Sequence, residues 1–411
     1  MSARYLRRSI ESLVERLLGE LPALLIVGPR ASGKTTTAIR HARTVVRLDR
    51  PAEAQAFRAD PDAALRGLEE PILLDEWQEV PDVLGAVKRS IDQDTRPGRY
   101  LLTGSVRAEL EAEGWPGTGR LVRIPLYGLT VNELGGHPDS TGLIDRLARG
   151  EGLEVPHSPP DLAGYIALAL SSGFPEAALA ASVDTRNRWL ESYVDQIVGR
   201  DALHVEPRRD PARLRRFVEA YALASAGVPD DKTLFEAAGI NRKTGLGYER
   251  LLTNLMLVES LPAWTSNRLK RLVRPPKRYL VDAGLLSGAL RVDERSVMRD
   301  GDLLGRVLDT FVTSQVRAEL AVAASRPRLF HLRTQQGRHE VDLVGEIAGS
   351  KVMAIEIKAT ASPRSDDARH IVWLRDQLGE RFVGGVVLHT GPRTFPLAER
   401  ITAAPIATLW A

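Results

Sequence analysis

A short apolar segment, Ala23–Val27, runs directly into the glycine-bounded loop Gly28–Thr35, and a helix-like segment follows. The loop reads GPRASGKT and fits the pattern G-x-x-x-x-G-K-[ST]. In such a strand–loop–helix the backbone N–H groups surround a phosphate, the lysine reaches the outer phosphates and the next hydroxyl ligates Mg²⁺. The pattern therefore predicts a site for ATP and Mg²⁺. Its expected contacts are Gly28, Pro29, Arg30, Ala31, Ser32, Gly33, Lys34, Thr35 and Thr36.

Short apolar runs alternate with helix-like stretches through the first third of the chain. This alternation is typical of a parallel, doubly wound sheet with helices on its faces. The loop-bearing segment is then one strand of an α/β domain. The expected strands are Ala23–Val27, Thr44–Leu48, Pro71–Leu74, Arg99–Leu102 and Leu121–Pro125.

Two adjacent carboxylates, Asp75 and Glu76, end the third apolar run. A nucleotide hydrolase needs one carboxylate beside the Mg²⁺ and another that orients and deprotonates water. We assign the first role to Asp75 and the general-base role to Glu76, with Lys34 supporting the reaction at the phosphates. The alternative interpretation of the pair is a surface turn.

Three further residues are candidates for the hydrolytic step. Thr103 and Ser105 end the fourth run, and their hydroxyls can bind the attacking water or the γ-phosphate; turn chemistry is the alternative. Arg120 opens the fifth run and can project from one subunit towards the γ-phosphate of a neighbour, as an arginine finger does. A solvated loop arginine is the alternative.

These motifs resemble ATPases of the AAA+ superfamily, in particular bacterial and archaeal proteins that carry a C-terminal domain of unknown function. The resemblance covers nearly the whole chain. It implies an ATPase core with a helical lid, a sensor at Thr103 or Ser105, and assembly into a homo-oligomeric ring such as a hexamer. The matching segments are Gly28–Thr35, Leu74–Gln78 followed by Pro81, Leu101–Ser105, Gly119–Arg120 and Gly173–Glu176.

Composition limits the class of protein. The chain has 411 residues, of which 43% are hydrophobic, so it can form several domains. It contains no cysteine, which excludes disulfides and thiol chemistry and is typical of the reducing cytoplasm. No uninterrupted apolar segment is long enough for a membrane span. The expected units are 1–139, the ATPase core; 140–205, the helical lid; 206–297, a basic module; and 298–411, a second α/β domain.

The basic module has the pattern of a winged helix-turn-helix between Asp231 and Trp264. Gly239 supplies the turn, and Asn241 caps the helix whose first residues would meet DNA. A cluster of basic residues follows, and such a cluster can neutralise backbone phosphates without reading sequence. A protein-contact module and a solvated charged face are the alternatives. The predicted DNA contacts are Arg242, Lys243, Arg268, Lys270, Arg271, Arg274, Lys277 and Arg278.

The last domain contains carboxylates at a spacing that suits metal chemistry. If the segments around Asp342 and Glu356 pair as a hairpin, Glu356 and Lys358 share a face beside Asp342. Two carboxylates can then bind Mg²⁺ while the lysine activates water. This arrangement resembles the PD-(D/E)xK nuclease superfamily, in which many members carry a glutamate where this chain has Asp309. The alternatives are an ordinary ion pair and a nuclease fold that only binds DNA.

The combined prediction is a P-loop (ASCE/AAA+) parallel-sheet ATPase with a helical lid, a winged helix-turn-helix and a PD-(D/E)xK-like α/β domain. The predicted function is a cytoplasmic, DNA-dependent ATPase or motor that acts on branched or recombination intermediates. An ATP-gated, Mg²⁺-dependent nuclease in defence or repair is one alternative. A switch in which the ATP state controls a partner protein, without movement on DNA, is another.

Overall fold

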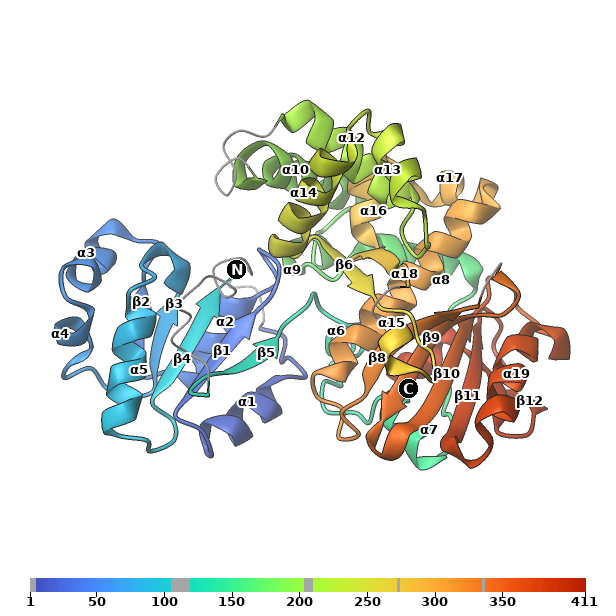
Figure 1. The fold of residues 1–411 in the computed structure, drawn as a ribbon, viewed down its shortest axis with the longest axis horizontal. Helices are drawn as coiled ribbons and strands as arrows, with labels where there is room; N and C mark the ends of the chain where they lie inside the picture. Colours follow the sequence, from blue (N-terminus) through green and yellow to red (C-terminus); the bar gives the residue numbers. More distant parts are fainter. Residues whose placement is uncertain (1–4, 105–118, 203–209, 272–273, 335–336) are drawn as a thin grey trace.

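The computed structural model describes residues 5–104, 119–202, 210–271, 274–334 and 337–411. Figure 1 shows an N-terminal α/β lobe at the left, a helical lobe above and a C-terminal sheet lobe at the right. Within the described residues, no helix combines the length and apolarity that a membrane crossing requires. The mixed α/β class predicted from the sequence is confirmed.

The N-terminal lobe is built on a five-stranded sheet in which every neighbouring pair is parallel. All five strands lie where the sequence predicts them, with ends that differ by at most two residues. Because the strands are parallel, their carboxyl ends share one edge of the sheet, where ligands bind in open α/β folds. In spatial order the strands are β2 (Thr44–Arg47), β3 (Ile72–Asp75), β4 (Tyr100–Gly104), β1 (Ala23–Val27) and β5 (Val122–Pro125).

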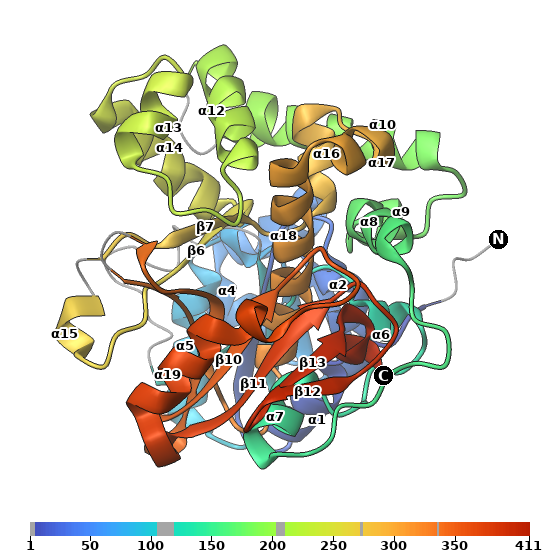
Figure 2. The ribbon, with the colours of Figure 1, turned by 90° about the vertical axis from the view of Figure 1, so that its right-hand side faces the viewer.

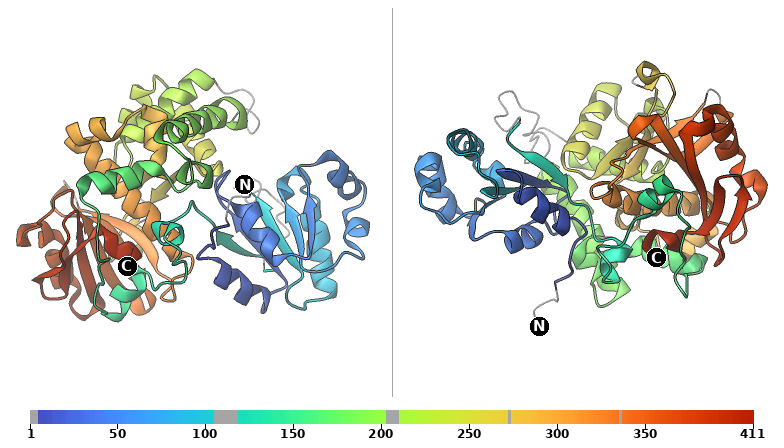
Figure 3. Two further views of the ribbon diagram at one scale, coloured as in Figure 1. Left: turned by 180° about the vertical axis from the view of Figure 1, so that it is seen from behind. Right: turned by 90° about the horizontal axis from the view of Figure 1, so that it is seen from below.

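Helices cover both faces of this sheet, as the view from below in Figure 3 shows. Alternate side chains of β1 enter different cores: Leu24 and Ile26 pack on the face that carries α1, whereas Leu25 and Val27 pack on the opposite face. This is why the strand is apolar throughout. The first face carries α1 (Glu11–Leu18) and α2 (Lys34–Ala38), and the second carries α3 (Pro51–Ala59), α4 (Pro61–Leu65) and α5 (Val83–Gln93).

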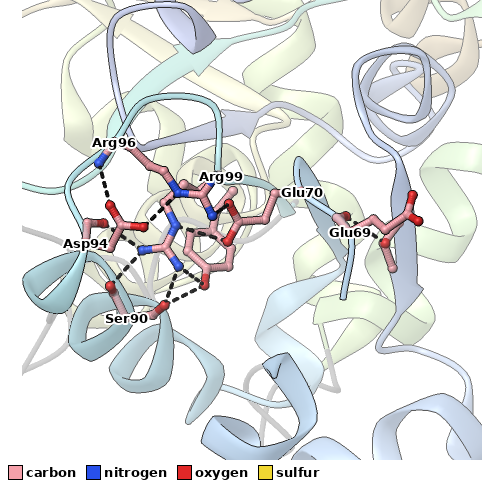
Figure 4. Close-up of polar contacts among 8 residues, drawn as sticks. Glu69, Glu70, Ser90, Asp94, Arg96 and Arg99 are labelled. Carbon is pink, nitrogen blue, oxygen red and sulfur yellow. Dashed lines mark hydrogen bonds and ion pairs between the residues drawn. The ribbon is translucent and has the colours of Figure 1, made fainter. Parts of the chain in front are cut away.

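A polar network anchors the end of α5 to the amino-terminal edge of the sheet (Figure 4). Arg99 is only 7% exposed and donates to Glu70 at 3.0 Å and to the carbonyl oxygens of Ser90 and Asp94 at 2.7 and 2.6 Å. Arg96 pairs with Glu70 and Asp94, both at 2.7 Å. The Arg99 guanidinium thus connects the C-terminal end of α5, at Ser90 and Asp94, to Glu70 just before β3.

The helical lobe shares one continuous apolar core with the C-terminal sheet. Buried residues of this core run from Leu143 to Leu409 and come from all three segments expected after residue 139. Those segments are therefore packed together in one body, and their boundaries as domain units stay predictions. The helices are α6 (Val131–Leu134), α7 (Leu143–Arg149), α8 (Leu162–Ser171), α9 (Pro175–Ala178), α10 (Val183–Gln196), α12 (Pro211–Leu223), α13 (Asp231–Ala237), α14 (Arg242–Asn254), α16 (Gly284–Leu290) and α17 (Glu294–Arg299).

Two glycines join the N-terminal lobe to the helical lobe by direct backbone contact. A Cβ atom on Gly128 would lie 2.7 Å from the carbonyl carbon of Gly173. The amide of Leu129 donates to the carbonyl oxygen of Gly173 at 2.5 Å, and the amide of Gly173 donates to Asp282 at 2.7 Å. No side chain fits between the two segments at this point.

The C-terminal lobe contains a six-stranded mixed sheet and the long helix α18 (Gly301–Leu320). In Figure 2, α18 runs from the helical lobe down behind the sheet. Strands β9 and β10 pair as an antiparallel hairpin, which is the pairing that the sequence-based placement of Asp342 beside Glu356 requires. In spatial order the strands are β12 (Phe395–Ala398), β13 (Ile401–Pro405), β11 (Phe382–His389), β10 (Lys351–Ile357), β9 (Glu340–Ile347) and β8 (Arg328–Arg333), with α19 (Arg369–Leu378) packed beside them.

The predicted helix-turn-helix is present as α13 and α14. Gly239 has a φ of +65° at the turn, and the side chain of Asn241 accepts from the amide of Thr244 at 2.9 Å, which caps α14. The expected wing is the two-stranded hairpin of β6 (Val258–Leu261) and β7 (Lys277–Leu280).

This hairpin is packed against the C-terminal sheet instead of projecting into solvent. Just after β6, the amide of Trp264 donates to the carbonyl oxygen of His331 on β8 at 2.6 Å. The Trp264 indole donates to Glu346 on β9 at 3.0 Å, and its ring lies in the core of that lobe. The hairpin therefore belongs to the joint between the two lobes.

Replacement of Arg278 by methionine tests how the other face of this hairpin is held against the helix-turn-helix. Arg278 on β7 is 4% exposed and pairs with Asp231 at 2.5 Å and Glu249 at 2.8 Å. Removal of a buried partner leaves carboxylates without their counter-charge, so we expect a loss of about 3 kcal/mol in the free energy of unfolding. Urea denaturation measures it. Arg242→Met, at an exposed position on α14, is the control and should change stability by less than about 0.5 kcal/mol. Equal effects of the two substitutions would contradict the interpretation.

Candidate functional site

The glycine-bounded loop lies at the carboxyl end of β1 and leads into α2. Gly33 has a φ of +91°, a conformation that residues with a Cβ rarely adopt, and it precedes the first helical residue, Lys34. A Cβ on Gly28 would lie 2.0 Å from the carbonyl oxygen of Leu126. Both glycines of the motif are thus required by backbone geometry, one for its dihedral angle and one for close approach.

Lys34 is buried beneath the loop, with 4% of its surface exposed. Its ammonium donates to the carbonyl oxygen of Pro29 at 2.8 Å, within the same loop. Burial lowers the pKa of Lys34 to about 8, although the nearby carboxylates of Glu76 and Asp75 oppose the shift. The loop therefore contains a cation whose charge is sensitive to pH in the nucleotide-free protein.

Three hydroxyl and carboxylate groups meet at the carboxyl edge of the sheet. Strand β4 lies between β1 and β3, so Thr103 lies between the loop and Asp75. Thr35 donates to Asp75 Oδ1 at 2.7 Å, and the Thr103 hydroxyl donates to the same oxygen. Asp75 is 4% exposed. Thr103 thus positions Asp75 in this structure, and its role as a sensor of water or phosphate stays a prediction.

Glu76 follows Asp75 in a left-handed conformation, with a φ of +52°. Its amide donates to the Thr103 hydroxyl at 3.3 Å, and the Gln78 side chain donates to its carboxylate. The left-handed backbone turns the chain out of the strand direction directly after Asp75. Such a conformation is uncommon for residues other than glycine, and it recurs at functional sites. The sequence motifs do not point to Gln78.

The loop residues fit a bound triphosphate. The Ser32 hydroxyl is buried and has no hydrogen-bond partner within the described residues. Backbone amides from Gly28 to Thr36, with the Ser32 hydroxyl and Lys34, would hold the phosphates. Thr35 and Asp75 would hold Mg²⁺.

Two contacts that the sequence did not indicate attach this loop to its surroundings. Arg8, which is 3% exposed, donates to the carbonyl oxygen of Ser32 at 2.8 Å and to those of Tyr127 and Gly128 at 2.8 and 2.9 Å. Tyr193 on α10 donates to the carbonyl oxygen of Arg30 at 3.1 Å. Both residues are far from the loop in sequence, so no local pattern identifies them.

Arg120 lies at the amino-terminal end of β5, whereas the phosphate loop lies at the carboxyl end of β1. It precedes the first residue of β5, which is parallel to β1, and it pairs with Asp92 at 2.8 Å. Its predicted role as an arginine finger therefore requires a neighbouring subunit, and it stays a prediction. Ser105 lies outside the described residues.

The basic residues predicted to bind DNA divide into two groups. Arg242, Lys243 and Lys270 are exposed, and Arg274 is partly exposed and donates to the carbonyl oxygen of Arg333 at 2.8 Å. The side chain of Arg268 lies outside the described part of the chain.

The second group is engaged within the protein, which corrects part of the prediction. Arg271 pairs with Glu346 at 2.6 Å, and Lys277 and Arg278 are 2% and 4% exposed and paired with carboxylates. Buried and neutralised side chains cannot reach a phosphate backbone, so Lys277 and Arg278 are not DNA contacts, and Arg271 is committed to Glu346.

The C-terminal carboxylates meet beside a cleft of about 880 Å³. The ammonium of Lys277 lies between Asp309 and Asp342, and Lys358 pairs with Glu356 at 2.7 Å. Burial raises the pKa of Glu356 to about 8 and that of Asp309 to about 6. Among the residues that the structure describes, no three acidic or histidine side chains are placed to hold a metal ion. The predicted Mg²⁺ site of Asp309, Asp342 and Glu356 does not fit this arrangement.

Comparisons with known proteins identify three segments. Residues 20–135 match the family described as an AAA domain, and residues 163–296 and 304–409 match two families described as domains of unknown function, DUF8612 and DUF4143. Over 404 residues the chain is 28% identical to uncharacterised proteins of Mycobacterium bovis and Mycobacterium tuberculosis, with 97% of this chain and 83% of theirs covered. A Walker-type ATPase of Pyrococcus abyssi is similar over 70% of this chain and 96% of its own, with a TM-score of 0.44 and 16% identity.

The lowered pKa of Lys34 predicts a pH dependence of ATP binding. Below pH 8 the nucleotide-free protein already carries the ammonium, whereas above it binding of the triphosphate requires proton uptake. We expect the affinity for ATP to fall by up to about tenfold per pH unit above 8. Fluorescence titrations between pH 7 and 9.5 measure the profile. In Lys34→Arg, whose guanidinium stays protonated, the profile should be flat. Identical slopes in the two proteins would show that another group titrates.

Proposed function

We propose that this chain, whose N-terminal domain is a P-loop ATPase of the AAA type, uses ATP hydrolysis to act on DNA. The observation that carries the ATP-dependent part is the hydrogen-bonded group of Thr35, Asp75 and Thr103 beside a phosphate loop with the required geometry. The DNA-dependent part is supported by the exposed basic residues at the start of α14. Branched or recombination intermediates are the proposed class of DNA.

Residues of the loop and of the neighbouring strand ends would have separate roles in hydrolysis. Lys34 and the loop amides bind and orient the phosphates, and Thr103 keeps Asp75 aligned with Thr35. Glu76 accepts the proton of the attacking water at its carboxylate, while Gln78 restricts the position of that carboxylate. Bound Mg²⁺ supplies neutralisation of the phosphate oxygens.

The DNA contact that we propose is the exposed start of α14. Arg242 and Lys243 occupy its first turn, beyond the Asn241 cap. In helix-turn-helix proteins this end of the second helix meets the major groove. Lys270 and Arg274, in the connection between β6 and β7, would add contacts with backbone phosphates.

The assembly that we propose is a homo-oligomeric ring, as the resemblance to AAA+ ATPases implies. Arg120 is too far from its own phosphate loop to serve it, because it lies at the amino-terminal end of β5. In a ring it would act on the nucleotide of the next subunit and stabilise charge that develops in the transition state.

A second candidate function is a switch that transmits the ATP state to a partner without movement on DNA. The contact between Tyr193 and the carbonyl oxygen of Arg30 supports it. This contact connects the phosphate loop directly to a helix of the large core, so a change in the loop has a route into the rest of the molecule.

Glu76→Gln tests the assignment of the general base. We expect the variant to bind ATP with an affinity within about threefold of the wild type, because the amide has nearly the same shape. The hydrolysis rate should fall by about 10²–10⁴-fold, the usual contribution of general-base catalysis. A phosphate-release assay and an ATP titration measure the two quantities. Glu79→Gln, at an exposed position of the same turn, is the matched control. Unimpaired hydrolysis by Glu76→Gln would refute the assignment.

Hydrolysis with single-stranded, duplex and four-way-junction DNA separates the two candidate functions. A DNA-directed ATPase should be stimulated by at least one form, and the stimulation should weaken with added salt. Substitution of both Arg242 and Lys243 by glutamine should weaken binding of that DNA, whereas Arg188→Gln, at an exposed position of α10, should not. Turnover that no DNA form changes would favour the switch.

A further inference from the structure

The acidic centre of the C-terminal lobe already contains a cation that belongs to the chain. Lys277 on β7 is 2% exposed. Its ammonium lies 2.5 Å from Asp309 Oδ2 on α18 and 2.9 Å from Asp342 Oδ1 on β9. One lysine thus bridges two carboxylates that come from separate elements of the lobe.

The remaining oxygens of the two aspartates also have donors from the chain. Asp309 Oδ1 accepts from the Tyr279 hydroxyl at 3.0 Å and from the Thr313 hydroxyl at 3.1 Å. Asp342 Oδ2 accepts from the amide of Ile357 at 2.9 Å. Each of the four carboxylate oxygens is therefore already hydrogen-bonded, and a metal ion would have to displace these donors.

Two lysines of the chain neutralise two of the three carboxylates of the centre without a metal ion. Lys277 is placed against Asp309 and Asp342, and Lys358 is placed against Glu356. A divalent cation between the two aspartates would lie within a few ångströms of the Lys277 ammonium. In a buried site, where charges are weakly screened, this repulsion opposes metal binding.

Lys277 is held in this position by the strand that carries it. Three residues further along β7, the amide of Leu280 donates to the Ser225 hydroxyl at 3.1 Å. Strand β6, its partner in the hairpin, is tied to α18 by the ion pair of Glu259 with Arg317 at 2.7 Å. These buried contacts fix the backbone of β7, and with it the Cα of Lys277, relative to α18.

We propose that Lys277 permanently occupies the place of a divalent cation. The group of Asp309, Lys277 and Asp342 is then an ion-pair joint between β7, α18 and β9, and the C-terminal lobe does not hydrolyse phosphodiester bonds. The nuclease-like arrangement of carboxylates serves to fix the helix-turn-helix module to the sheet. This inference is independent of the proposed ATPase cycle.

The first test is a titration of nucleotide-free Lys34→Ala protein with Mn²⁺ alone, followed by electron paramagnetic resonance. This background weakens nucleotide binding at the phosphate loop, so that carried-over nucleotide does not report metal there. We expect Asp342→Asn to leave Mn²⁺ binding up to 1 mM unchanged, as about 1 mM is the scale of weak sites, and we expect no cleavage of plasmid or junction DNA with Mn²⁺ or Mg²⁺. Saturable binding or cleavage that disappears on Asp342→Asn would overturn the proposal.

The second test measures the joint by melting temperature in the full chain. Lys277→Met should lower the melting temperature by about 5 °C or more, because it leaves two carboxylates without their counter-charge. Addition of Asp342→Asn to Lys277→Met should recover part of the loss, since one of the unpaired charges is removed. A role for Lys277 in packing alone predicts no recovery, and that result would contradict the joint. If Lys277→Met does not fold, the Mn²⁺ titration still decides the proposal.

Discussion

The hydrogen bonds that Thr35 and Thr103 donate to one oxygen of Asp75 connect the three central strands at their carboxyl ends. Each residue comes from a different strand or from the helix after it, so the group forms only when the parallel sheet has the observed order. In a buried setting such shared bonds are costly to break singly, because each loss leaves an unsatisfied polar group. The position of Glu76 depends on this group, because its amide donates to the Thr103 hydroxyl.

A comparable constraint organises the other half of the molecule on strand β7. Neighbouring residues of a strand point to opposite faces, and Lys277 and Arg278 each find carboxylates on their own face. Lys277 meets Asp309 and Asp342 of the C-terminal lobe, whereas Arg278 meets Asp231 and Glu249 of the helix-turn-helix. One short strand therefore neutralises acidic groups from two lobes.

Sequence patterns predicted the features that depend on residues close together in the chain. The glycine-bounded loop, the five strands and the Asn241 cap follow from spacing and turn chemistry, and the AAA-type domain predicted from these motifs is confirmed. Arg8 and Tyr193 could not be found in this way, because their contacts with the loop join residues far apart in the chain. The prediction that Lys277 contacts DNA was wrong for a related reason. A cluster of basic residues in the sequence shows the charge of a segment, but it does not show which groups the segment faces after folding.

The contact between Gly128 and Gly173 has a consequence for movement between the lobes. Two backbones touch there with no intervening side chain, next to the Arg8 contacts that reach both Gly128 and the phosphate loop. A fulcrum of this kind allows rotation about the contact while it keeps the two segments at a constant separation. Such a rotation would carry the helical and C-terminal body as a unit, because the two share one apolar core.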